Sequence, residues 1–96
     1  MLNIILQEEH GIPIKTCYSS LDYEEFENMR FDTFKLIRYI DFYGDTVFNN
    51  LQMDDLISDF KLLKSFSKQY EVINEIIELA IECKGSVHTY LKFVGD

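Results

Sequence analysis

The chain has 96 residues, of which 47% are hydrophobic and 15% aromatic, and this suffices for one domain, residues 1–96, with a proper core. Its 17 Asp and Glu residues outnumber its 9 Lys and Arg residues, so the formal net charge is −8. Nucleic-acid binding is disfavoured because phosphate contacts need a basic face, whereas a basic partner protein fits this charge. High solubility is the alternative explanation of the acidity.

The first six residues are mostly apolar, but they are too few for a secretion signal and include no basic residue. No apolar stretch is long enough to cross a membrane. We therefore expect a cytoplasmic protein whose two cysteines, Cys17 and Cys83, are reduced. Their spacing fits neither a redox motif nor a zinc site.

The N-terminal segment predicts a β-hairpin. Residues 2–6 form an apolar run typical of a strand, and a polar turn follows at residues 8–11. Residues 12–18 alternate as a second strand. Because Pro13 cannot donate a hydrogen bond to a β-ladder, we expect this strand at an edge of the sheet or with a bulge.

The next segment predicts a short helix and then a strand. Residues 21–29 carry several acidic residues, which a helix N-terminus favours, and a loop with one helical turn is the alternative. Residues 35–41 alternate, with large apolar or aromatic side chains on both faces. This pattern predicts a central strand that is covered on one face and partly covered on the other.

A polar turn is predicted at residues 41–46, where Gly44 supplies a positive φ, and Asp41 and Asp45 can hydrogen-bond the turn backbone. Asn49 or Asn50 can then cap a helix, and Asn49 with Gln52 has the spacing of a capping box. The oxygen ligands are four residues apart and no bidentate Glu follows, so we expect no calcium or other metal site.

The same turn is a candidate binding surface for a partner protein, because it combines aromatic side chains with carboxylates. The alternative is that these residues only stabilise the turn. The candidate residues are Tyr39, Asp41, Phe42, Tyr43 and Asp45.

Two amphipathic helices are predicted over residues 51–66 and 69–84. In the first, the predicted core residues are Met53, Leu56, Ile57, Phe60 and Leu63, and Asp59 falls outside them. The second helix carries four carboxylates on one face, predicted to be a solvent-facing row with no local countercharge. A plain solvated face and a surface that attracts a basic protein are both open. The row consists of Glu71, Glu75, Glu78 and Glu82.

Residues 87–94 predict a last strand in a central position, with Val87, Thr89, Leu91 and Phe93 on one face. Together, these elements predict an α+β fold. We expect a small, mainly antiparallel sheet of four strands with the two long helices packed on one face.

The chain from Arg38 onward contains R-Y-I-D-F-Y-G-D-T-V-F-N and ends in H-T-Y-L-K-F-V-G-D. These two motifs resemble those of an uncharacterised family of small bacterial proteins, with an R-Y-[IV]-D-x-Y-G-D-T-V-F-N core and a last strand H-x-Y-L-x-F-x-G-D. Phe42 stands where the family's turn has Pro. The resemblance implies no catalytic residue, and in size and charge such proteins are similar to bacterial immunity proteins.

The sequence contains no glycine-rich phosphate loop, no metal-ligand spacing and no nucleophile motif, so we expect neither an enzyme nor a bound cofactor. The leading hypothesis is an acidic interaction protein that binds and neutralises a basic protein, such as a toxin domain. The alternative is a structural or regulatory module that forms a homodimer through an exposed sheet face or edge.

Overall fold

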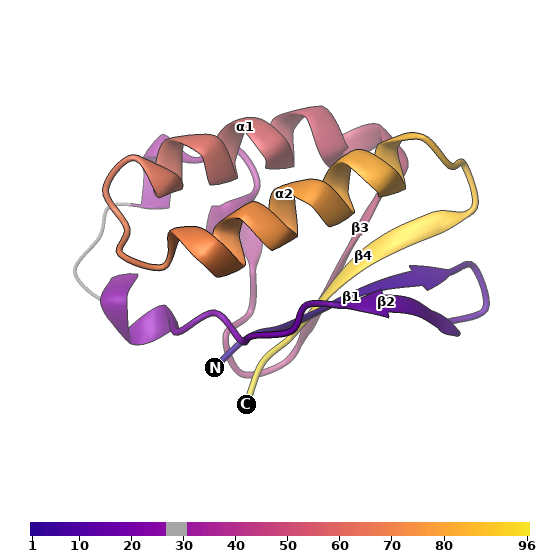
Figure 1. Ribbon diagram of the computed structural model, residues 1–96, viewed down its shortest axis with the longest axis horizontal. Coiled ribbons are helices and arrows are strands. Elements are labelled where there is room, and N and C mark those ends of the chain that lie inside the picture. The colour runs from indigo at the N-terminus through magenta and orange to yellow at the C-terminus, as the bar shows by residue number, and fades with distance from the viewer. Residues whose placement is uncertain (27–30) are drawn as a thin grey trace.

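The computed structural model describes residues 1–26 and 31–96. Four antiparallel strands form one sheet in the order β2-β1-β4-β3, and two helices cover one of its faces (Figure 1). This arrangement confirms the predicted α+β fold. The main elements in chain order are β1 (Asn3–Glu8), β2 (Pro13–Thr16), β3 (Asp45–Asn49), α1 (Met53–Lys64), α2 (Tyr70–Lys84) and β4 (Thr89–Val94).

The predicted hairpin is confirmed, and β2 is an edge strand as Pro13 required. The register shifts at Leu6 and Gln7, so the strand also carries an irregularity. Gly11 closes the turn with a φ of 85°, a backbone conformation that glycine adopts readily. All four residues of β2 are exposed.

The core lies between the sheet and the two helices. On β4, Thr89, Leu91 and Phe93 of the predicted face are buried, but Val87 is exposed because the strand begins two residues later than predicted. The Phe93 ring stacks on that of Phe60 from α1, with centroids 5.8 Å apart. Each such buried aromatic side chain contributes about 1.5–3 kcal/mol to folding.

The strand predicted for residues 35–41 is wrong. This segment contains a 3-10 helix, η3 (Ile37–Tyr39). The buried carboxylate of Asp59 accepts hydrogen bonds from the backbone N–H groups of Lys35, Leu36 and Ile37 at 3.0, 2.7 and 3.1 Å. In a strand, such N–H groups would donate to a neighbouring strand. Here they donate to Asp59, and these bonds stabilise a tight turn instead.

The prediction that Asp59 lies outside the core is also wrong, because its side chain faces η3 and is only 3% exposed. The five residues of the predicted stripe on α1 are buried or packed against the core. In front of α1, a short 3-10 helix, η4 (Asn50–Gln52), begins at the predicted capping box. Asn49 and Gln52 form both reciprocal hydrogen bonds of that box.

Two further 3-10 helices lie between β2 and η3: η1 (Tyr23–Phe26) and η2 (Phe31–Thr33). The helix predicted for residues 21–29 therefore reduces to one 3-10 turn in its described part. Residues 27–29 of that prediction lie outside the described residues. Phe26 from η1 is buried in the core, so this turn closes one end of the molecule.

Candidate protein-binding site

Three glutamates of the predicted row on α2 lie across from the end of β2 and the residue after it: Glu75, Glu78 and Glu82. A cleft of about 430 Å³ separates the two elements. From the β2 side it is lined by Lys15, Thr16 and Cys17, and from α2 by Glu75, Glu78, Leu79 and Glu82.

The predicted absence of a countercharge along this row is wrong. Lys15 Nζ lies 2.8 Å from Glu82 Oε1, and the backbone N–H of Tyr18 donates to Glu75 Oε2 at 2.8 Å. The hydrogen bond to Glu82 raises the pKa of Lys15, so its ammonium stays charged. Glu71 and Glu78 form no ion pair or hydrogen bond within the described part of the chain, although the charge of Glu78 also helps to raise the pKa of Lys15.

Cys17 lines the cleft but has a poorly reactive thiol. Its side chain is buried, and burial raises the pKa of the thiol to about 12, with a further contribution from Glu75. The thiolate is therefore scarce at neutral pH, and nucleophilic chemistry at this position is disfavoured.

A second cleft, of about 380 Å³, continues along the N-terminal end of α2. We call the surface that contains both clefts the α2 seam, defined by residues 15–20 on one side and residues 68–82 on the other. The second cleft is lined by Ser19, Ser20, Lys68, Gln69, Tyr70, Glu71 and Val72.

The other predicted surface, the turn patch (residues 39–45), has a different character. Asp41 accepts a hydrogen bond from the N–H of Tyr43 at 2.9 Å, which confirms that this aspartate stabilises the turn. The positive φ predicted for Gly44 is wrong, because Gly11 is the glycine with a positive φ among the described residues. Tyr39 and Tyr43 are exposed, whereas Phe42 is partly buried and packs against the core. Asp45 pairs with Lys92 of the neighbouring strand at 3.3 Å.

The turn patch is fastened to the C-terminal end of the chain. Gly95 N–H donates to the carbonyl of Gly44 at 2.7 Å, and Asp96 N–H donates to the carbonyl of Phe42 at 3.2 Å. A Cβ atom on Gly95 would lie 2.3 Å from the Phe42 oxygen, so this close approach requires glycine. These contacts therefore hold the turn against the C-terminal end of the chain.

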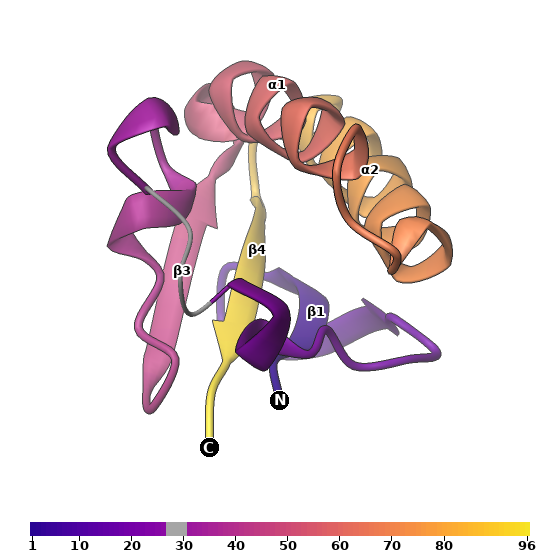
Figure 2. The same cartoon turned by 90° about the vertical axis from the view of Figure 1, so that its left-hand side faces the viewer.

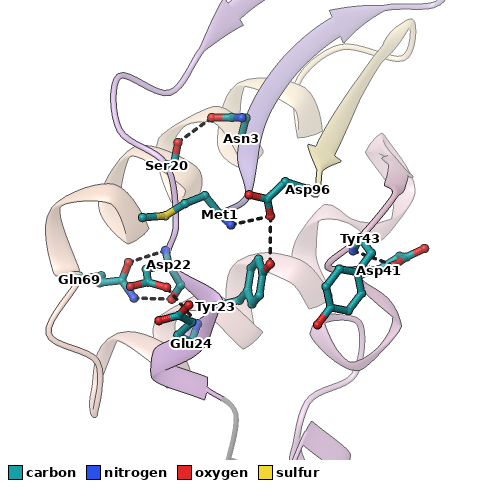
Figure 3. A network of polar contacts seen from close by, with 10 residues as sticks. All are labelled: Met1, Asn3, Ser20, Asp22, Tyr23, Glu24, Asp41, Tyr43, Gln69 and Asp96. Atoms are coloured by element: carbon teal, nitrogen blue, oxygen red, sulfur yellow. Dashed lines mark hydrogen bonds and ion pairs between the residues drawn. The ribbon is translucent and has the colours of Figure 1, made fainter.

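Figure 3 shows the polar network beside this turn, where Asp96 Oδ1 accepts from the Met1 ammonium at 2.8 Å and from the Tyr23 hydroxyl at 2.9 Å. These bonds lower the pKa of Asp96, and the bond to Asp96 raises the pKa of Tyr23 to about 12. The Tyr23 ring stacks on Phe42 with centroids 4.8 Å apart. Phe42 is thus engaged within the molecule and is less available to a partner than Tyr39 or Tyr43.

The structure does not bring the two predicted surfaces together. The turn patch leads into β3 at one edge of the sheet, whereas the α2 seam lies beside β2 at the other edge. Three strand spacings separate these edges, a distance of about 14 Å. The nine predicted residues therefore form two patches, one aromatic and one acidic.

Sequence reasoning missed Lys15 and Tyr18, which complete the acidic patch. The alternation of β2 placed Lys15 on the face opposite Ile14 and Thr16, but the sequence did not show that this face meets α2.

Both histidines lie near Glu9: His88 Nδ1 is 3.1 Å and His10 Nε2 is 3.6 Å from its carboxylate oxygens. Within residues 1–26 and 31–96, no three His, Cys, Asp or Glu side chains gather as metal ligands would.

No protein-family model, curated protein or solved structure matches this chain. The resemblance to small bacterial proteins therefore stays a prediction. No helix in the described ranges has both the length and the apolar character needed to cross a membrane.

Proposed function

We propose that this protein binds and neutralises a basic partner protein, as the immunity proteins of bacterial toxin systems do. The observation that carries the proposal is the acidic wall of α2, which borders an open cleft and includes two carboxylates without a partner among the described residues. A surface of one charge attracts an oppositely charged protein and speeds its association. A basic active-site rim of a toxin or nuclease has the complementary charge, and binding there would block access to it.

The partner is to be identified by affinity purification of the tagged protein from its host, followed by mass spectrometry. The Kd of the complex with this partner is then measured for the wild type and for the double variant Glu71→Lys/Glu78→Lys. These two positions are preferable to Glu75 because the Glu75 carboxylate also holds the backbone of Tyr18. We expect the variant to weaken binding about tenfold or more at low ionic strength, mainly through slower association.

The matched control is Asp54→Lys/Asp55→Lys, which changes the charge equally on exposed positions of α1. We expect the effect of the α2 variant to shrink at about 1 M salt, where the Debye length is only ~3 Å. The proposal fails if no heterologous partner is found, or if both double variants change the affinity equally.

The second candidate function is a homo-oligomeric module, and a specific observation favours it. The sheet face opposite the helices has no covering element in the described structure (Figure 2). Val47 and Ile14 are each about half exposed, and the strand registers place Val47 level with Lys92 and Ile5. Sedimentation equilibrium distinguishes the candidates, since self-association without a heterologous partner would favour the module.

A further inference from the structure

We propose that the α2 seam binds an extended basic segment of the partner, with Arg or Lys at alternate positions and with Tyr18 as the aromatic anchor. This inference rests on the proposed function, because it names the part of the partner that the acidic surface receives. It differs from the sequence prediction, which placed the aromatic contacts in the turn patch.

The edge strand β2 offers backbone groups to an added chain. Cys17 N–H donates to the carbonyl of Ile4 at 2.9 Å, so the backbone of Cys17 faces β1. Orientation alternates along an antiparallel strand, so the N–H and C=O of Thr16 point away from β1. Thr16 also lines the larger cleft. An extended chain can pair with such an edge through its own backbone.

The spacing of the carboxylates on α2 suits the same extended segment. The four glutamates follow one another at steps of four, three and four residues, which correspond to about 4.5–6 Å along the helix axis. In an extended chain, every second side chain points the same way at a spacing of ~6.6–6.8 Å. Alternate cations therefore roughly match successive glutamates. The contact between Lys15 and Glu82, at 2.8 Å, is an example of this interaction within the chain itself.

Tyr18 has the properties of an anchor residue. Its side chain is 96% exposed, although the bond from its N–H to Glu75 fixes its backbone. It lies in the chain between the residues that line the two clefts. An exposed aromatic ring on a fixed backbone beside carboxylates suits a cationic partner, because the ring face attracts the same Arg or Lys side chains that the carboxylates bind. Tyr70, 55% exposed, offers a second ring in the smaller cleft.

A second copy of this chain fits the α2 seam less well. Each copy carries a net charge of −8, and its own glutamates would meet those of the seam. The charge complementarity therefore selects a basic segment from another protein.

The test uses two synthetic peptides of one composition, three Arg and four Ser residues. In one peptide Arg alternates with Ser, and in the other the three Arg residues are consecutive. Each is titrated into the isotope-labelled full chain and followed by amide NMR, and hydrogen exchange is measured on the complexes. The variants are Tyr18→Ala and, as the matched control from the turn patch, Tyr43→Ala, since Tyr43 is also an exposed tyrosine.

We expect the alternating peptide to bind about tenfold more tightly than the clustered one and to shift the amides of residues 15–20 and 70–82. Tyr18→Ala should weaken this binding about tenfold, and Tyr43→Ala should leave it unchanged. Hydrogen exchange of the Thr16 amide should slow in the complex, because a backbone hydrogen bond then protects it.

Equal binding of both peptides, or shifts spread over the acidic surface of α1 as well, would show attraction by charge alone and overturn the inference. The absence of any binding would overturn it too. If the natural partner binds and the α2 variant weakens it, but the alternating peptide does not compete, the inference fails and the proposed function stands. If the peptide binds as expected but no partner exists, the proposed function fails instead.

Discussion

Among single residues, Asp59 has a structural role that the sequence did not reveal. One buried carboxylate satisfies three consecutive backbone N–H groups of the segment before η3. Its partners lie 22 to 24 residues away in the chain, so no local pattern could show this role. The same long-range contact explains why the alternation of residues 35–41 was misleading. Alternation predicts a strand only where the backbone has no stronger hydrogen-bond partner.

Replacing this carboxylate should destabilise the protein strongly. We expect Asp59→Ala to lower the free energy of unfolding by about 2–4 kcal/mol, because it leaves three N–H groups without an acceptor. Asp59→Asn retains one acceptor oxygen and should cost about half as much. Urea denaturation of the purified variants measures both values.

The matched control is Asp55→Ala, one turn earlier on α1, where the carboxylate is exposed and pairs with Lys35 at 3.3 Å. Exposed ion pairs contribute about 0–1 kcal/mol, so this variant should remain close to the wild type. An equal loss of stability in Asp59→Ala and Asp55→Ala would contradict the role assigned to Asp59.

At the scale of elements, the periodic segments were predictable and the irregular ones were not. Both long helices, the hairpin and the central strand β4 follow from the apolar spacing of their segments. The acidic face of α2 was equally visible in the sequence, but the strand that it faces was not. Which edge of the sheet a helix covers depends on how the elements pack, and the sequence pattern of each element does not contain that information.

The junction of η1 and α2 gives a pH-dependent prediction. Burial alone would raise the pKa of Glu25, but hydrogen bonds from Ser67, Gln69 and the N–H of Lys68 outweigh it and lower the pKa below its ordinary 4.5. A carboxylate whose folded pKa is depressed stabilises the protein above its unfolded pKa, and this contribution disappears as the pH falls through the folded pKa.

We therefore expect Glu25→Gln to be less stable than the wild type at neutral pH and to approach it as the pH falls below about 4.5. Urea denaturation at a series of pH values measures this difference. Glu24→Gln is the control, because the Glu24 carboxylate forms no hydrogen bond within the described ranges and the change should show no such convergence. A difference for Glu25→Gln that stays constant with pH would contradict the prediction.

Over the whole molecule, some carboxylates form ion pairs and others do not. Exposed pairs such as Lys84 with Asp54 and Lys92 with Asp45 neutralise part of α1 and of the sheet. On α2, Glu71 and Glu78 have no such partner in the part of the chain that the structure describes. These two carboxylates belong to a row of four on one face of α2, and like charges at this spacing repel one another.

This imbalance predicts opposite effects of salt on stability and on binding. Self-repulsion destabilises a compact acidic protein, and salt screens it, so we expect Tm at pH 7 to rise by a few degrees between about 0.01 and 1 M sodium chloride. Binding of a basic partner should weaken over the same range, because screening also reduces the attraction. Glu71→Gln/Glu78→Gln should show a smaller rise in Tm, since two of the repelling charges are gone. A fall in Tm with salt would mean instead that ion pairs such as that of Lys15 with Glu82 outweigh the repulsion.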